Sequence, residues 1–417
     1  MTATDLTAAW LRELDGLAAH QGDWLSPPAR REVRVGDLPA QPTPQEWATL
    51  GPKLVAMRDH VLALQRGPTR LYRKSLFRGE QSGHSNADEQ YRLEEDQSEV
   101  IGRLYLLDGG INPPFTPNLQ RFVAFVPATY AGATDGGHYA WVHYTPVWGG
   151  ERGAAPRARA VARDYPGGLW THSYIADYLL GHRLIAAYAH ARVNAVLLLP
   201  VHRFSSGDAL APLGQPANLL TILRELFGAL ELADRRLRGR AGRPRQIKAY
   251  GVSCYSFGAQ YATRPFQRTD VSDADYHRLR AAVLLDGVAS EPVRVCRSAF
   301  GDGDGERSWL ALPVPDSQAP RRLAMYQQPN AGGRDFVAAV GAVLRTGPPA
   351  PGRTIRRTPA WRRNHGYFHR VDNRQMVCTA HEDRCGSGTL DYAYCHWRIN
   401  TLFMEEGFTF SRDCFQW

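Results

Sequence analysis

The chain has 417 residues, a formal net charge of +9 and a hydrophobic fraction of 43%, which is enough to bury a large core. It contains no run of about 18 consecutive apolar residues, which argues against a membrane-spanning helix. The positive charge comes almost entirely from arginines spread along the chain, so we expect no nucleic-acid partner and no transmembrane segment.

The first 20 residues indicate in which cellular compartment the protein works. They carry acidic residues in an amphipathic pattern and lack the basic start and apolar centre of a secretory signal. We therefore predict a cytoplasmic protein, with export without a classical signal peptide as the alternative.

Residues 1–98 are predicted to form a helical extension that ends in a polar loop. Apolar residues recur at helical spacing in LTAAWLRELDGLAA and again in PKLVAMRDHVLALQ. The segment GEQSGHSNADEQYRLEEDQSE, residues 79–99, is polar and acidic, which is typical of a loop or a mobile arm.

Residues 99–370 are predicted to form an α/β core, with a mainly parallel sheet flanked by helices. Short apolar runs alternate with longer helical patterns, and the continuous aliphatics of VNAVLLLPV suit a strand that is covered on both faces. The expected strands are residues 100–107, 121–130, 138–147, 193–201, 247–255, 280–287, 321–328 and 354–361, and the expected helices are residues 173–192, 218–237 and 335–345.

One segment of this core, AYGVSCYSFGAQYA, passes abruptly from an apolar strand to a helical pattern. A serine between two small residues, placed where a strand turns into a helix, is the pattern of a nucleophile elbow. Cys254 and Gly258 are the small residues around Ser256, and they would let the strand and the helix pack closely. The amide of Phe257 would then point to where an oxyanion forms.

The stretch CYSFGAQYA resembles the nucleophile elbow of α/β-hydrolases, especially lipases and acyl-chain thioesterases, in which Gly-x-Ser-x-Gly-Ala is typical. It departs from that pattern by having Cys254 at the first small position. A rival frame would place the nucleophile at Ser253, but its second small position is occupied by the bulky Tyr255.

The resemblance implies a triad in the chain order serine, acid, histidine. Asp286, at the end of the strand AAVLLDG, is the preferred acid, and Asp335 in AGGRDFV is the alternative. His365 is the preferred base because it follows the expected strand 354–361, with His369 and His381 behind it.

The implied reaction is cleavage of an ester or thioester of an apolar acyl group, with a lipid or an acyl carrier as the possible partner. Ser256 would attack the acyl carbonyl, and Trp148, in the loop after AWVHYTPV, would supply the second oxyanion donor. This chemistry needs no cofactor. The alternatives are a non-catalytic binding protein with an α/β-hydrolase-like fold and, in another class, a basic surface that binds nucleic acid.

Residues 371–417 are predicted to pack on the core as a segment rich in cysteine and histidine. Three cysteines and a histidine close together could hold zinc, but their spacing is irregular and contains no CxxC pair, so we predict no metal site. Disulfides such as Cys378–Cys385 or Cys395–Cys414 and reduced thiols are both left open.

Overall fold

The structure is a computed structural model in which part of the chain is described. The described residues are 29–30, 61–63, 69–72, 75–82, 85–93, 98–108, 119–145, 184–202, 211–214, 216–233, 237, 246–267, 276–301, 308–312, 314, 318–328, 336–344, 354–357, 364–371 and 392–416.

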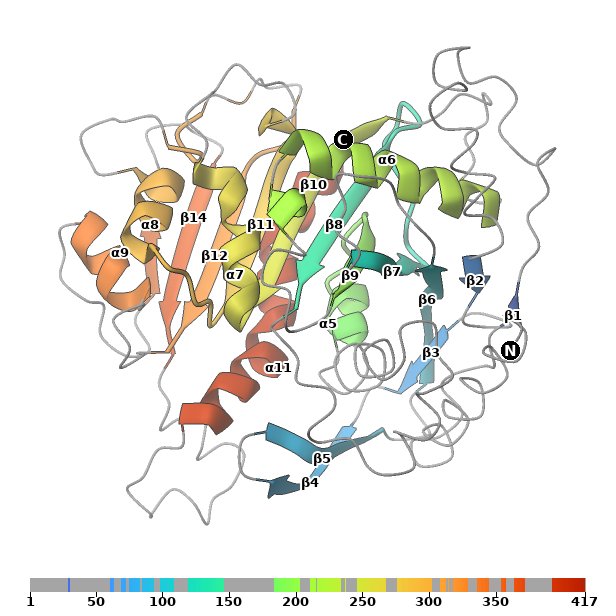
Figure 1. Ribbon diagram of the computed structural model, residues 1–417, viewed down its shortest axis with the longest axis horizontal. Coiled ribbons are helices and arrows are strands. Elements are labelled where there is room, and N and C mark those ends of the chain that lie inside the picture. The colour runs from blue at the N-terminus through green and yellow to red at the C-terminus, as the bar shows by residue number, and fades with distance from the viewer. Residues whose placement is uncertain are drawn as a thin grey trace.

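One large sheet organises this part of the chain (Figure 1). Among the described residues it has 12 strands, in the order β1-β2-β6-β7-β9-β8-β10-β11-β12-β14-β13, with β3 paired to β6. The strands from β9 to β14 in this order run parallel to one another, whereas β6, β7 and β13 pair antiparallel with their neighbours. The predicted α/β class is therefore confirmed, with a parallel block from β9 to β14, but β1, β2, β3, β6 and β7 on one side and β13 on the other extend the sheet by antiparallel pairing.

The strand bounds follow the apolar runs closely in the centre of the sheet. Both β8 and β11 are buried at every residue, and β10 is buried at all but one, as expected for strands covered on both faces. The strands of the sheet are Ala29–Arg30 (β1), Val61–Ala63 (β2), Thr69–Tyr72 (β3), Ser98–Asp108 (β6), Leu119–Pro127 (β7), His138–Tyr144 (β8), Val196–His202 (β9), Ile247–Tyr255 (β10), Leu279–Leu285 (β11), Arg322–Gln327 (β12), Thr354–Arg357 (β13) and His365–Arg370 (β14).

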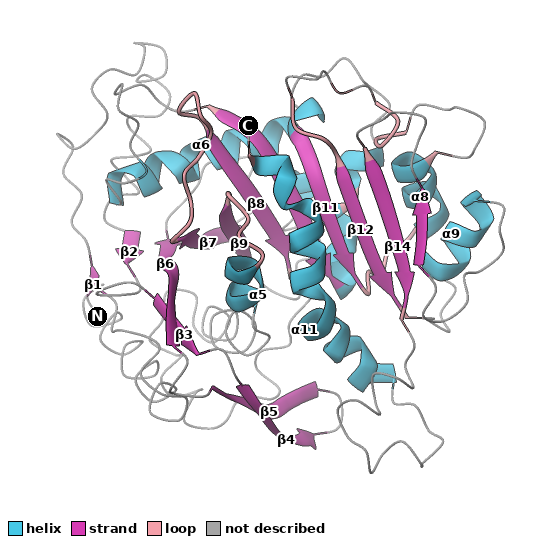
Figure 2. Cartoon of the chain, turned by 180° about the vertical axis from the view of Figure 1, so that it is seen from behind, coloured by secondary structure: helices cyan, strands magenta, loops and turns pink. Residues whose placement is uncertain are grey.

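Helices cover both faces of the sheet, and each face has its own hydrophobic core (Figures 1 and 2). One core joins α6, α7, α8 and α9 to the sheet, and the other joins α5 and α11 to it. The helices are Leu184–His190 (α5), Pro216–Ala233 (α6), Ala259–Ala262 (α7), Pro292–Phe300 (α8), Phe336–Leu344 (α9) and Tyr392–Ser411 (α11). Short 3-10 turns are Ala211–Gly214, Ser256–Gly258, Arg264–Gln267, Tyr276–Arg278 and Arg412–Phe415. None of the helices described is long and apolar enough to cross a membrane.

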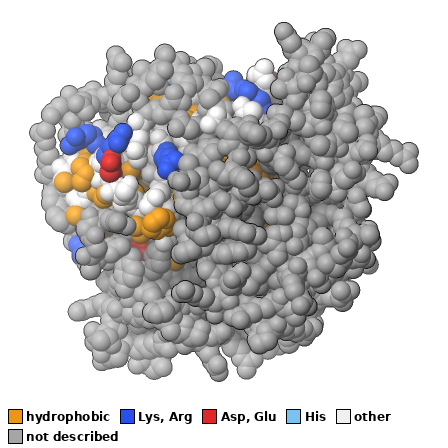
Figure 3. All heavy atoms as spheres, in the orientation of Figure 1, with side chains coloured by type: hydrophobic (Ala, Val, Ile, Leu, Met, Phe, Trp, Pro, Cys, Tyr) orange, Lys and Arg blue, Asp and Glu red, His pale blue; other side chains and the backbone are white. Residues whose placement is uncertain are grey.

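The described surface around α8 is mixed in character (Figure 3). Glu291 and Arg294 form an exposed ion pair at 2.9 Å, and Val293 between them is 42% exposed. Basic, acidic and apolar side chains lie close together in the part of this face that is described.

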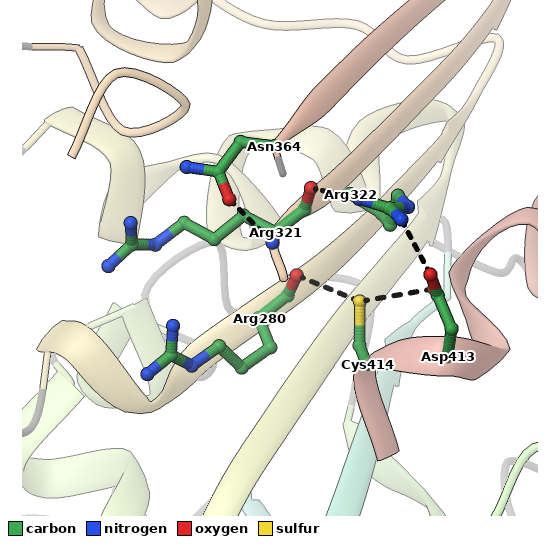
Figure 4. Close-up of polar contacts among 6 residues, drawn as sticks. All are labelled: Arg280, Arg321, Arg322, Asn364, Asp413 and Cys414. Carbon is green, nitrogen blue, oxygen red and sulfur yellow. Dashed lines mark hydrogen bonds and ion pairs between the residues drawn. The ribbon is translucent and has the colours of Figure 1, made fainter. Parts of the chain in front are cut away.

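The end of the described chain is tied to the sheet by specific contacts (Figure 4). Asp413 forms an ion pair with Arg322 at 2.5 Å, and the thiol of Cys414 donates to the carbonyl oxygen of Arg280 at 3.4 Å. Because Cys414 is a free, buried thiol, the proposed disulfide between Cys395 and Cys414 is wrong. Residues 412–415 therefore pack against the starts of β11 and β12 as part of the fold.

The structure differs from the sequence prediction in the N-terminal part. Residues 61–63, within an expected helix, form β2, and much of the expected loop 79–99 forms a hairpin of β4 (Ser75–Ser82) and β5 (Ser85–Leu93). The strand β2 exists through pairing with β6, a contact distant in sequence that helical periodicity cannot reveal. The division of the chain into three segments stays a prediction.

Candidate active site

The chain changes direction sharply at the carboxyl end of β10, between β8 and β11. Tyr255 is extended, with φ −126° and ψ 140°, whereas Ser256 has φ +53°. A 3-10 turn and then α7 follow directly, which is the strand, turn and helix order expected of an elbow. A left-handed backbone costs a non-glycine residue roughly 1–2 kcal/mol, so the surrounding packing must hold Ser256 in place.

Two glycines provide that packing by letting neighbouring segments approach the turn. A Cβ at Gly258 would lie 2.2 Å from the carbonyl oxygen of Tyr144, at the end of β8. A Cβ at Gly287 would lie 2.8 Å from the Cβ of Ala259, the first residue of α7. The turn is thus held between the ends of β8 and β11, and neither glycine can become a larger residue without displacing it.

The rival serine, Ser253, has a different environment. It is fully buried, and its hydroxyl lies 2.7 Å from Nε1 of Trp141 and 2.7 Å from Nδ1 of His143. Burial lowers the pKa of His143 to about 3, so the imidazole is neutral at physiological pH. Ser253 therefore joins two strands through a buried network, whereas Ser256 is partly exposed.

Asp286, the preferred acid, lies beside this turn and also has a left-handed backbone, with φ +44°. Its backbone is fixed on one side by its own amide, which donates to the carbonyl oxygen of Tyr326 at 2.7 Å. On the other side the amide of Val288 donates to the carbonyl oxygen of Ser256 at 2.9 Å. The structure thus brings Ser256 and the segment that follows Asp286 into direct contact.

The carboxylate of Asp286 is buried and accepts three hydrogen bonds from the end of β12. Nε2 of Gln327 donates to Oδ1 at 2.8 Å, and the amide of Gln328 donates to the same oxygen at 3.1 Å. Nε2 of Gln328 donates to Oδ2 at 2.6 Å. Sequence reasoning missed both glutamines, although two adjacent amide side chains at the end of an apolar strand are an unusual signal.

His365 does not reach this site. It is the first residue of β14 and pairs with Arg322, the first residue of β12, whereas the candidate site lies at the carboxyl ends of the strands. Arg370, at the other end of β14, pairs with Gln327, so His365 is displaced along the strand by roughly 16 Å. His365 is therefore not placed to act as the base, because residues 365–370 form the last parallel strand of the part of the chain that is described, and His365 begins it.

His369 lies nearer to the carboxyl edge but on the face covered by α11. Its ring is 5.3 Å from that of Phe403 and 6.0 Å from that of Tyr326, centroid to centroid. Burial lowers the pKa of His369, an effect that Glu406 opposes. The other candidates, Asp335, Trp148 and His381, lie outside the described residues.

A further polar group at this edge was not anticipated from the sequence. Thr145 follows β8 and is 2% exposed, and its hydroxyl has no hydrogen-bond partner among the described residues. Its carbonyl oxygen would lie 3.1 Å from a Cβ at Gly258, so Thr145 lies against the turn that carries Ser256.

The cysteines whose side chains are described lie inside the fold. Cys254, Cys296 and Cys414 are free and buried, and burial raises the pKa of each thiol. Within the described ranges, no group of three histidine, cysteine or acidic side chains could hold a metal ion. Cys378 and Cys385 lie outside the described residues.

Comparison with known proteins gives weak structural neighbours. No family model matches the chain, and no curated protein matches it in sequence. The rice cell wall degrading esterase LipA from Xanthomonas oryzae is 14% identical, with 51% of this chain and 49% of that chain covered and a TM-score of 0.23. An acylaminoacyl peptidase from Pyrococcus horikoshii is 10% identical, with 85% and 55% covered and a TM-score of 0.28. The chain spans about half the length of each of these proteins.

Proposed function

We propose that this chain is a serine hydrolase of the α/β-hydrolase type that cleaves an ester or thioester of an apolar acyl group. The observation that carries the proposal is the backbone of Ser256, which stands at φ +53° between a buried parallel strand and a helix. This backbone lifts the serine clear of the sheet edge, and the neighbouring carboxylate of Asp286 supplies the acid of a triad.

The proposed base is His381. Triads of this type follow the chain order serine, acid, histidine, and His381 comes after β14, the last strand of the parallel block. It takes the place of His365, which lies at the opposite end of that strand.

The reaction proceeds in two steps. The oxygen of Ser256 attacks the acyl carbon while His381 accepts its proton, and the same histidine then protonates the departing alcohol or thiol. Water, deprotonated by His381, then attacks the acyl carbon, the bond from that carbon to the oxygen of Ser256 breaks, and His381 returns the proton to Ser256 as the carboxylic acid leaves. The amide of Phe257, with a donor from the loop after β8 such as Trp148, stabilises the oxyanion, and one such donor contributes roughly 10²–10³-fold in rate.

The experiment is hydrolysis of p-nitrophenyl esters with short and medium acyl chains, together with labelling by a fluorophosphonate probe. Ser256→Ala and His381→Gln should abolish turnover, and Ser256→Ala should abolish labelling. The matched controls are Ser253→Ala and His365→Gln, which should keep activity wherever the variant folds.

Activity that survives in Ser256→Ala would overturn the assignment of the nucleophile. A wild-type protein that neither hydrolyses these esters nor takes up the probe would favour the non-catalytic binding protein instead. If activity rises with acyl length, the apolar acyl preference is supported.

A further inference from the structure

Two consecutive glutamines, which the sequence analysis did not assign to the site, bind the carboxylate of Asp286. Gln327 and Gln328 are 2% and 0% exposed, and between them they direct two side-chain amides and one backbone amide at Asp286. A buried carboxylate is costly unless it is hydrogen-bonded, so these donors are needed wherever Asp286 is ionised.

The geometry of the sheet explains why both glutamines reach the same group. Leu285 pairs with Tyr326 across β11 and β12, so Asp286 lies level with Gln327 just beyond the paired residues. The carbonyl oxygen of Gln327 accepts a bond from the amide of Val371 at 2.8 Å, which ties this level of the sheet to the end of β14.

The two side chains bind different oxygens of the carboxylate. Gln327 donates to Oδ1 and Gln328 donates through Nε2 to Oδ2, so both the position and the rotation of the carboxylate plane are fixed. Amides are neutral donors. Unlike an arginine or a lysine, they hold the anion without a positive charge that would weaken its attraction for a protonated histidine.

We infer that Gln328, assisted by Gln327, is a positioning residue that holds Asp286 in the orientation in which it accepts the N–H of the catalytic histidine. The inference rests on the proposed function, and it selects Asp286 over Asp335 as the acid. Gln328 acts through Asp286 and needs no contact with the substrate.

The test is the kinetics of Gln328→Met on a p-nitrophenyl ester, with Gln318→Met as the matched control. Gln318 is also hydrogen-bonded to a charged side chain, that of Arg280, but at the opposite edge of the sheet. Gln328→Met should lower kcat by about 10- to 100-fold with little change in KM, the range found when residues that orient metal-binding side chains are replaced. The acidic limb of the kcat/KM profile should move to lower pH, because the imidazolium loses part of its stabilisation. Gln318→Met should show neither change.

A double-mutant cycle separates positioning from a structural effect. Asp286→Asn should lower kcat by about 10⁴-fold, and adding Gln328→Met to it should have little further effect, since the two residues act as a unit. If Gln328→Met does not fold, Gln327→Met provides the same readouts.

The two proposals fail in different ways. Wild-type kcat and an unshifted pH profile in Gln328→Met, with Ser256→Ala inactive, would overturn the positioning role alone. A fall in thermal stability with unchanged kcat would also overturn it, because the glutamine would then be structural. Full activity in Ser256→Ala would overturn the proposed function itself.

Discussion

The buried pair of His143 and Ser253 should make the stability of the protein depend on pH. Burial lowers the pKa of His143 from 6.5 to about 3 in the folded state, whereas the unfolded chain keeps the ordinary value. Between these values the unfolded state binds more protons than the folded state. The contribution of neutral, buried His143 to the free energy of unfolding is therefore fully present above pH 6.5 and is lost as the pH falls toward 3.

The size of the effect follows from the shift. Each pH unit below 6.5 costs about 1.4 kcal/mol, so the free energy of unfolding should fall by about 2 kcal/mol between pH 8 and pH 5 through His143 alone. His143→Gln keeps a polar side chain beside Ser253 and removes the titration.

Equilibrium urea unfolding, followed by tryptophan fluorescence at pH 8 and pH 5, measures the difference. The wild type should lose about 2 kcal/mol more than His143→Gln between the two conditions. Equal losses in the two proteins would refute the reasoning, because they would mean that His143 titrates alike in the folded and unfolded chains.

Three further outcomes are expected. Gly258→Ala should destabilise the protein by about 1–3 kcal/mol and lower esterase activity, because its Cβ would meet the carbonyl oxygen of Tyr144 at 2.2 Å; unchanged thermal stability and activity would contradict this. Glu231→Ala should cost about 1–3 kcal/mol in urea unfolding, since it removes a carboxylate hydrogen-bonded to the buried His138 at 2.6 Å. An unchanged free energy of unfolding would show that the pair is dispensable. Cys254 should resist alkylation by iodoacetamide at pH 8 in the native protein and react once the protein is denatured, because burial both shields the thiol and raises its pKa. Peptide mapping that finds Cys254 alkylated under native conditions would contradict this.

The central strands could be predicted because each is a short apolar run buried on both faces. The predicted bounds 247–255 match β10, and the aliphatics of β9 and β11 were equally informative. The last strand was misplaced because residues 354–357 and 365–370 form an antiparallel pair, and only the second of these joins β12. Histidine and arginine at the ends of the second segment gave it the composition of a loop.

Part of the candidate site could also be predicted from the sequence. The turn at Ser256 has a local signature, since small residues must flank it, and Asp286 ends a recognisable strand. His365 was chosen because residues 354–361 were expected to be the last strand. Since His365 instead begins β14, the wrong strand assignment led to the wrong choice of base. Gln327 and Gln328 could not be connected to Asp286 from the sequence, because that contact requires knowing that β11 and β12 are neighbours.

The position of α11 in the chain has a consequence for synthesis. This helix covers the face of the sheet that carries Trp141 and Tyr326, yet it comes after every strand of that sheet. A nascent chain that has completed β14 therefore has α5 to cover this face but still lacks α11, whose Phe408 packs on Trp141. Because transiently exposed apolar surface favours aggregation, we expect this part of the face to be protected only once residues 392–411 have been synthesised.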